Sequence, residues 1–239
     1  MESALLREAE AVFGEAAARK LQHRTAVSSP QSGDAPGAAA SDGADVDPGD
    51  VQAEATPPIA HLNLTPRQER RLWRHIRHVE NFWQSLNEIE PGTIARIAQL
   101  VDQQRWEVIF LTKRPETEGA TAQVQSQRWL ESKGFPLPSV YVVQGSRGRI
   151  AAALSLDVVI DDRPENCFDV VVDSQAKPIL VWRDRRETLP AAAQRLGIGI
   201  VSTVTECLDL LATADTQPSD TSMLKRVKRL FGLKEREDA

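Results

Sequence analysis

Apolar residues in the second half of the chain form short β-branched runs that alternate with stretches of helical spacing. The runs predict strands at residues 107–111, 140–143, 157–160, 178–181 and 199–201. Helices are expected between them at residues 93–103, 119–132 and 147–154, and after the last strand. That final helix should be capped by Thr203, with Glu206 three residues on as in a capping box. Strands separated by helices of this length are typical of a parallel sheet covered on both faces, so the pattern predicts an α/β fold.

One segment, residues 168–172, is open to two interpretations. Its β-branched content favours a strand. Pro164, at what would be a first helical position after an acidic turn, favours a helix. We prefer the helix.

Two further helical patterns precede the alternation. Residues 3–22 carry an apolar stripe among Ala and Glu, which predicts a short helix that docks on another part of the chain. Residues 66–86 have apolar residues at helical spacing, so we expect one amphipathic helix with a basic outer face. Its aromatic residues, Trp73, Phe82 and Trp83, are more typical of a core than of a ligand contact.

Composition divides the chain into four parts. Residues 25–58 contain Ser, Pro, Gly, Asp and Ala with few large apolar side chains, which predicts a disordered acidic linker. It joins an N-terminal helical part, residues 1–24, to a domain at residues 59–214, within which residues 66–90 are a helical segment. The tail at residues 215–239 contains a basic amphipathic helix. We expect that helix to pack on the domain or stay solvated, with at most weak contact to a membrane surface.

Charge and cysteine content limit the classes of partner. With 41% hydrophobic and 26% charged residues, the 239-residue chain can form a packed core. The net charge of -5 is unevenly placed and therefore says little about partners. We expect no nucleic-acid partner, because no recognised binding module accompanies the basic C-terminal helix and the globular part is not basic overall. Cys167 and Cys207 lack metal-ligand spacing and are expected to be buried apolar side chains. No signal peptide or bilayer-spanning run is evident, which predicts a cytoplasmic protein.

Two of the expected strands end in side chains suited to phosphate chemistry. One is followed by Thr112, Lys113 and Arg114, a hydroxyl and two cations that suit a phosphate oxygen. Another ends at Asp161 and Asp162, whose mutual repulsion raises one pKa unless a cation lies beside them. Mg²⁺ is the hard cation that carboxylates usually bind in such a place. Because ligands collect at the carboxyl ends of parallel strands, we expect the two groups to share one pocket.

The acidic pair has alternative partners and an alternative role. Arg147 and Arg149 lie on the helix that leads into it, and either guanidinium could neutralise the pair. In the plainer interpretation Asp161 and Asp162 are a helix cap and a surface carboxylate at the turn before Pro164.

Together these residues resemble three motifs of the haloacid dehalogenase (HAD) superfamily of phosphohydrolases. Thr112 matches the second motif, Arg149 the third, where the family usually has Lys, and the pair Asp161 and Asp162 the fourth. The stretches FLTKRP and IDDRPENC are most similar to the 5'(3')-deoxyribonucleotidase branch. The resemblance covers roughly residues 59–211. It implies a HAD-like, Rossmann-like three-layer parallel sheet with a small helical cap, a Mg²⁺ site, and a phosphorylated small molecule such as a nucleotide as ligand.

The first HAD motif, DxDx[TV], is degraded. Its best match is IAHLNLT, in which His61, Asn63 and Thr65 stand in the places of Asp, Asp and Thr. The resemblance implies that the first Asp attacks phosphorus and the second acts as general acid and base. His61 and Asn63 are therefore degenerate catalytic positions, and we expect weak or lost hydrolysis.

Two functions stay open at this point. One is a Mg²⁺-dependent phosphomonoester hydrolase of the 5'-nucleotidase type. The other is a non-catalytic pseudoenzyme that binds a phospho-ligand or a protein. A further alternative is that HLNLT is not the first motif, and that unrelated sequence has replaced the true strand.

Overall fold

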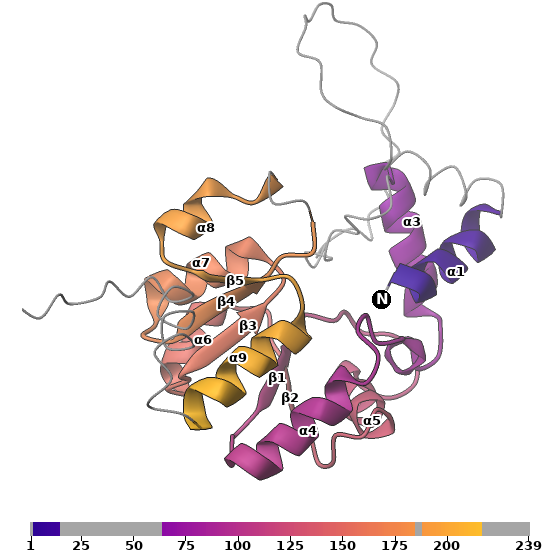
Figure 1. Ribbon diagram of the computed structural model, residues 1–239. Helices are drawn as coiled ribbons and strands as arrows, with labels where there is room; N and C mark the ends of the chain where they lie inside the picture. The colour runs from indigo at the N-terminus through magenta and orange to yellow at the C-terminus, as the bar shows by residue number, and fades with distance from the viewer. Residues whose placement is uncertain (1, 15–63, 185–187, 217–239) are drawn as a thin grey trace, which may run out of the picture. The chain divides into compact units, whose positions relative to one another are not determined.

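A computed structural model of the chain describes residues 2–14, 64–184 and 188–216. The chain divides into two compact units, of which the first comprises Met1–Asn87 and Lys113–Trp129 and the second Glu88–Thr112 and Leu130–Ala239. Figure 1 shows the elements with their labels. The predicted linker, His61, Asn63 and the basic C-terminal helix lie outside the described residues. The predicted domain boundaries stay a prediction.

Unit 1 contains two helices that pack on each other, α1 (Glu2–Phe13) and α3 (Pro66–Arg77). α3 begins with a capping box: Gln68 N donates to the Thr65 hydroxyl at 3.3 Å, and Thr65 N donates to Gln68 Oε1 at 2.9 Å. The two helices bury apolar side chains at Ala4, Leu5, Ala9, Leu72, Trp73 and Ile76. The N-terminal helix, which the sequence predicted to dock on another part of the chain, therefore docks on α3. α1 ends at Phe13, before the predicted residue 22, because Gly14 adopts a φ of 83° that closes the helix.

The single helix predicted for residues 66–86 is wrong, because α3 ends at Arg77. Glu118 is inserted where the next helical bond would form: its N–H donates to Arg77 O at 2.8 Å, and its carbonyl accepts from Asn81 N at 2.8 Å. Asn81 takes a left-handed φ of 52°, and a short 3₁₀-helix, η2 (Phe82–Ser85), follows. Periodicity predicted the burial of Trp73, Phe82 and Trp83 correctly but not the break in the helix.

Unit 2 contains two parallel sheets. β1 (Ile109–Thr112) pairs with β2 (Ser139–Val142), and β3 (Val158–Asp161), β4 (Lys177–Val181) and β5 (Gly199–Val201) pair in that order. Its helices, in chain order, are α4 (Thr93–Gln104), α6 (Arg147–Ala153), α7 (Pro164–Asp173), α8 (Ala191–Arg195) and α9 (Val204–Thr216). Most of α5 (Ala122–Ser132) belongs to unit 1. The predicted α/β class with parallel strands is confirmed.

Most element boundaries agree with the periodicity to within one to three residues. The helix preferred for residues 168–172 is confirmed as part of α7. The strand predicted from residue 107 begins at Ile109, and the helix predicted from residue 119 begins at Ala122. The pattern did not predict α8, a five-residue Ala-rich turn too short for a helical period to be visible. Within the described ranges, no helix combines the length and the apolar character that a bilayer span requires.

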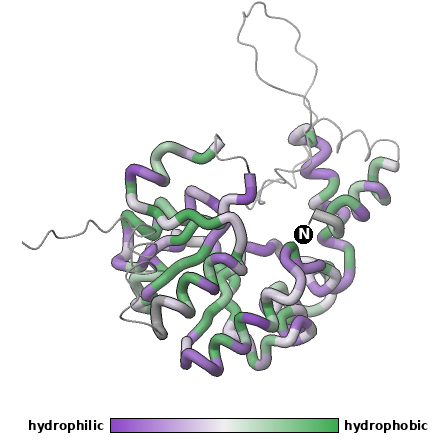
Figure 2. The backbone as a smooth tube through the Cα atoms, viewed as in Figure 1, coloured by the Kyte–Doolittle hydropathy of each residue, from purple (hydrophilic) through white to green (hydrophobic). Residues whose placement is uncertain are grey.

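Helices cover both faces of the β3–β4–β5 sheet, whose strands Figure 2 shows as largely hydrophobic. Ile179 and Val181 on β4 pack with Cys207 of α9, whereas Leu180, which points the other way, packs with Cys167 of α7 and Ala193 of α8. Burial of each large aliphatic side chain contributes about 1.5–3 kcal/mol. Both cysteines are free and buried, as predicted, and burial raises the pKa of each thiol to about 12.

Helices α6 and α7 approach most closely at Gly148. A Cβ atom at that position would lie 2.0 Å from the carbonyl oxygen of Asp169 and 2.7 Å from the Asp173 Cβ. Ser146 caps α6 and its hydroxyl donates to Asp173 Oδ2 at 2.9 Å, which fixes the start of the helix against α7. Only glycine permits this packing, and it places the preceding residue, Arg147, in the interior.

Gly148→Ala is expected to lower the free energy of unfolding by about 2 kcal/mol or more, because the new methyl group collides with backbone. Gly145→Ala is the matched control, since nothing lies within 4 Å of a Cβ there and its φ is not left-handed. Urea denaturation of both variants tests this, and equal stabilities for the two would contradict the packing described.

Candidate functional site

Asp161, at the carboxyl end of β3, is held by three hydrogen bonds from two nitrogen donors. Its Oδ1 accepts from Arg163 N at 2.9 Å and from Asn166 Nδ2 at 3.0 Å, and its Oδ2 lies 2.9 Å from the same Asn166 nitrogen. The bond to the backbone two residues on forms a turn that leads into α7 at Pro164. Asp161 thus has the turn-forming role that the plainer interpretation of the sequence gave it.

The negative charge of Asp161 is only partly compensated. Burial raises the pKa of its carboxyl group, and the neighbouring charge of Asp162 raises it further. The hydrogen bonds from Asn166 and Arg163 and the charge of Arg147 lower this pKa, but burial outweighs them. A cation bound at this carboxylate would therefore be favoured.

Arg147 is the basic residue that the structure places beside Asp161. Its side chain is 8% exposed, and its Nε lies 4.0 Å from Asp161 Oδ2, a charge contact rather than a hydrogen bond. Its Nη1 is buried and has no hydrogen-bond partner within the described ranges. Burial lowers the pKa of Arg147 and Arg163 lowers it further, whereas Asp161 and Asp169 raise it. The buried guanidinium group of Arg147 therefore lies beside the Asp161 carboxylate at the end of β3.

Arg149, the residue matched to the third motif, lies elsewhere on the same helix. Its side chain is 83% exposed and its Nε lies 3.9 Å from Asp173 Oδ2. Residues two apart on a helix do not share a face, so only one of the two arginines can reach Asp161. Of the alternatives that the sequence left open, the structure brings Arg147 to the acidic pair.

Asp162 is exposed, and its carboxylate forms no hydrogen bond or ion pair with any described residue. It suits Mg²⁺, which takes one or two carboxylates and completes its shell with water and phosphate oxygens. Asp161 Oδ2 accepts one hydrogen bond and could contribute as well, although Arg147 opposes a cation on that side. Among the described residues, no three or more His, Cys, Asp or Glu side chains are grouped so that they could hold a metal ion. The site therefore offers a metal only its two carboxylates.

Thr112 closes β1 as predicted, in register with Val142. Its carbonyl accepts from Val143 N at 2.9 Å, and its side chain is half-buried. β1 and β3 belong to different sheets, and no hydrogen bond links Thr112 to Asp161 or Asp162 within the part of the chain described. Lys113 is exposed. The shared pocket predicted for the two strand ends stays a prediction.

Arg114 belongs to unit 1, where it contacts two indole rings. Its guanidinium lies 5.2 Å from the ring centroid of Trp83 and 5.8 Å from that of Trp129, and its Nη1 donates to Ser126 Oγ at 2.7 Å. Burial lowers its pKa to about 10. These contacts give Arg114 a structural role in unit 1, and its predicted contact with phosphate stays a prediction.

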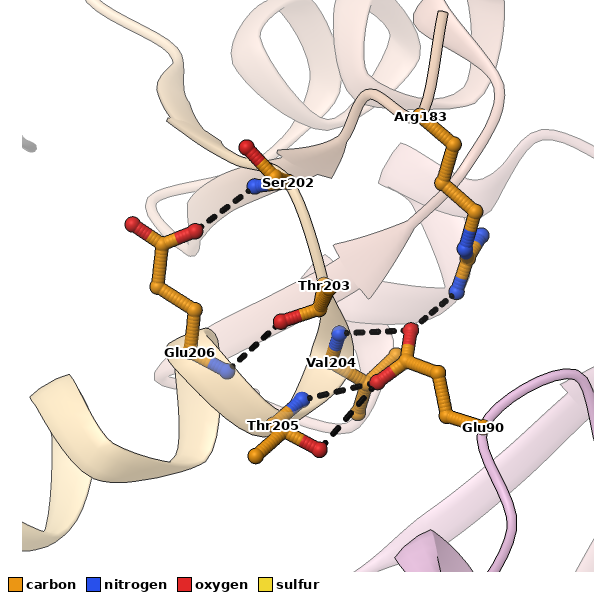
Figure 3. A network of polar contacts seen from close by, with 7 residues as sticks. All are labelled: Glu90, Arg183, Ser202, Thr203, Val204, Thr205 and Glu206. Carbon is orange, nitrogen blue, oxygen red and sulfur yellow. Dashed lines mark hydrogen bonds and ion pairs between the residues drawn. The ribbon is translucent and has the colours of Figure 1, made fainter.

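A carboxylate of the chain itself occupies the start of α9, as Figure 3 shows. Glu90 Oε1 accepts from Val204 N at 3.0 Å and Arg183 Nη2 at 2.7 Å, and Oε2 accepts from Thr205 N at 3.0 Å. Burial raises the Glu90 pKa, but the hydrogen bonds from Val204, Arg183 and Thr205 outweigh it and leave the pKa lowered. Because Arg183 follows β4 and α9 follows β5, Glu90 fills the carboxyl ends of both strands.

The cap predicted for this helix is confirmed with a shift of one residue. Glu206 N donates to Thr203 Oγ1 at 3.0 Å, as expected. The return bond goes from Ser202 N to Glu206 Oε2 at 2.8 Å, instead of from Thr203 N.

The sequence did not single out three residues that build this region. Asn166 holds both oxygens of Asp161, Gly148 lets Arg147 enter the interior, and Glu90 caps α9 from 114 positions away. Asn166 could have been found, since it lies one helical turn after the acidic pair. Glu90 and Gly148 act through contacts between distant or separately folded segments, which leave no local pattern.

Comparisons of the chain with protein-family models, with curated proteins and with solved structures found no match. The functional argument therefore depends on the geometry of these residues.

Arg147→Gln is expected to lower the free energy of unfolding by about 2–4 kcal/mol, because it leaves the buried Asp161 carboxylate without its cation. Arg149→Gln removes an exposed guanidinium and should cost less than about 0.5 kcal/mol. Urea denaturation at pH 7 compares the two, and an equal loss in both would show that Arg147 does not compensate Asp161.

Glu90→Gln is expected to lower the free energy of unfolding by about 2 kcal/mol at pH 7, because a charged acceptor with four donors becomes neutral. The Glu90 pKa is lower in the folded than in the unfolded chain, so the unfolded chain binds the proton first as the pH falls. The contribution of the Glu90 charge to the free energy of unfolding is therefore complete above the ordinary Glu pKa of about 4.3. It is lost as the pH falls through the lower pKa that Glu90 has in the folded chain.

The measurement is denaturant unfolding of both proteins between pH 7 and pH 3, where the difference between them should shrink. Glu131→Gln, at an exposed site, is the control and should match the unmodified protein at each pH. A difference independent of pH would mean that the charge of Glu90 is not what stabilises α9.

Proposed function

We propose that the chain is a HAD-like domain that binds a phosphomonoester at the carboxyl ends of β1 and β3, and that it hydrolyses this ligand weakly or not at all. The contact between Arg147 and Asp161 carries the proposal. The HAD resemblance implies a basic residue on the helix before the acidic strand, and a buried arginine on α6 lies 4.0 Å from the first carboxylate. Helices on both faces of the β3–β4–β5 sheet also support the three layers of a HAD-like fold.

The described residues can supply binding but not covalent chemistry. Thr112 would donate its hydroxyl to a phosphate oxygen, and Asp162, helped by Asp161, would hold Mg²⁺. When bound, the ion would screen the charge of the phosphate dianion. Arg147 would keep Asp161 ionised and in place, which makes it a positioning residue.

Loss of hydrolysis is proposed from the sequence of the first motif. His61 and Asn63 lie outside the described residues, and neither carries a carboxylate. An asparagine can neither protonate a leaving group nor activate water. A nucleoside monophosphate is the ligand class that the deoxyribonucleotidase resemblance favours.

Binding is tested by thermal unfolding with millimolar deoxynucleoside monophosphate or inorganic phosphate, with and without Mg²⁺. We expect a higher melting temperature for the unmodified protein and no such shift for Thr112→Val or Asp162→Asn. Asp157→Asn is the matched control, since Asp157 is exposed just before the amino end of β3, so it should respond like the unmodified protein. No shift in the unmodified protein, or an equal shift in Asp162→Asn, would contradict the proposal.

Hydrolysis is measured in parallel with an aryl phosphate and the same nucleotides. Little turnover is expected unless His61→Asp and Asn63→Asp are introduced together, when turnover should rise. Substantial turnover in the unmodified protein that Asp162→Asn abolishes would establish an active phosphatase and overturn the weak-hydrolysis part of the proposal.

A further inference from the structure

Four arginines of α3 lie on one exposed face of the helix. They are three or four positions apart, so they are neighbours on the helix surface. We call this set the arginine face; it consists of Arg67, Arg70, Arg71 and Arg74. The orientation of the helix is fixed, because Leu72, Trp73 and Ile76 on its other side are buried. The arginine face is therefore directed outward by the core of unit 1.

The arginine face has no acidic partner within the described ranges. None of the four guanidinium groups forms an ion pair with a described residue, and Arg71 lies over the ring of Phe13 at 5.6 Å from its centroid. Two carboxylates of unit 1 pair with histidines of α3 and its C-terminal end: Glu8 with His75 and Glu118 with His78, each at 2.9 Å. One helical turn further on, Arg77 and His78 line a shallow depression with Glu116 and Glu118, so acidic residues return there.

This arrangement opposes the stability of the helix that carries it. Like charges three or four positions apart repel each other on a helix surface. Arg67 also lies in the first turn, at the positive end of the helix dipole, where a cation is unfavourable. Side chains that destabilise the helix on which they lie are expected at functional sites.

The chemistry of the arginine face selects among anionic partners. A protein interface usually has an apolar centre, and stable insertion into a lipid surface requires apolar side chains. α3 offers neither on its exposed face, because its large apolar residues are buried. Nucleic acid binds through phosphate charge alone, and the guanidinium group matches two phosphate oxygens at once.

The geometry of α3 points to a contact between the arginine face and the phosphate backbone of nucleic acid, independent of base sequence. From Arg67 to Arg74 the helix rises about 10 Å, and that length of duplex carries about six phosphate charges over its two strands. This function goes beyond phosphomonoester binding. It also replaces the expectation of no nucleic-acid partner, which depended on overall charge and on the lack of a recognised binding module, and not on the placement of arginines on one face.

The test is fluorescence anisotropy of the full chain with a labelled 20-base-pair duplex and a single-stranded RNA of mixed sequence, from 50 to 200 mM KCl. We expect dissociation constants on the order of micromolar at 50 mM and a logarithmic salt slope of about −3 to −4 for the duplex. The variant Arg67→Gln, Arg70→Gln, Arg74→Gln should bind about tenfold more weakly or worse, with the slope reduced by about three.

The matched control carries the same change of charge at exposed sites elsewhere, Arg128→Gln, Lys177→Gln and Arg195→Gln, and should bind like the unmodified protein. Circular dichroism should show that the arginine-face variant melts no lower than the unmodified protein, because repulsion has been removed. The thermal shift with nucleotide should persist in that variant, which separates this test from the test of phosphomonoester binding. No binding at 50 mM KCl, equal losses in the two triple variants, or equally tight binding of poly-glutamate would each overturn the inference.

Discussion

The close contact of α6 with α7 is the constraint on which the acidic strand end depends. Because Gly148 has no side chain, α6 can lie against the backbone of Asp169, and the residue before it is carried into the interior. That residue is Arg147, whose charge then lies 4.0 Å from Asp161. Asp161 in turn forms the turn that starts α7, the helix against which α6 packs. The packing of α6 on α7 and the charge contact between Arg147 and Asp161 therefore depend on each other.

Charged groups at the carboxyl edge of the β3–β4–β5 sheet are compensated to different degrees. At β4 and β5, Arg183 and the first N–H groups of α9 bind the carboxylate of Glu90, so the anion-binding capacity of a helix start is already used. At β3, burial and the adjacent Asp162 raise the pKa of Asp161 in spite of Arg147. An external cation gains most at β3, and an external anion would have to displace Glu90 at β4 and β5. This difference favours the acidic pair as the ligand site in the function proposed above.

The sequence predicted features that depend on local pattern. β-Branched runs located all five described strands, and the Asp turn and Pro164 located the start of α7. What it did not predict depends on contacts between segments. Glu118 ends α3 by entering between Arg77 and Asn81, although the apolar spacing continues through residue 83. The choice between Arg147 and Arg149 was open because it depends on how α6 packs on α7, and the role of Glu90 depends on a partner 114 residues away.

Net charge is a poor guide to this protein because its two signs are segregated. The chain carries −5 overall, yet α3 holds four exposed arginines on one face with no acidic partner in the described ranges. The helix tolerates their repulsion because other interactions outweigh it: the Thr65 capping box satisfies its first N–H groups, and Leu72, Trp73 and Ile76 bury its inner face. The stabilising residues and the arginines are different side chains of one helix. The interactions that hold α3 in place therefore do not involve the arginine face, and its guanidinium groups can be replaced without loss of the cap or of the buried contacts.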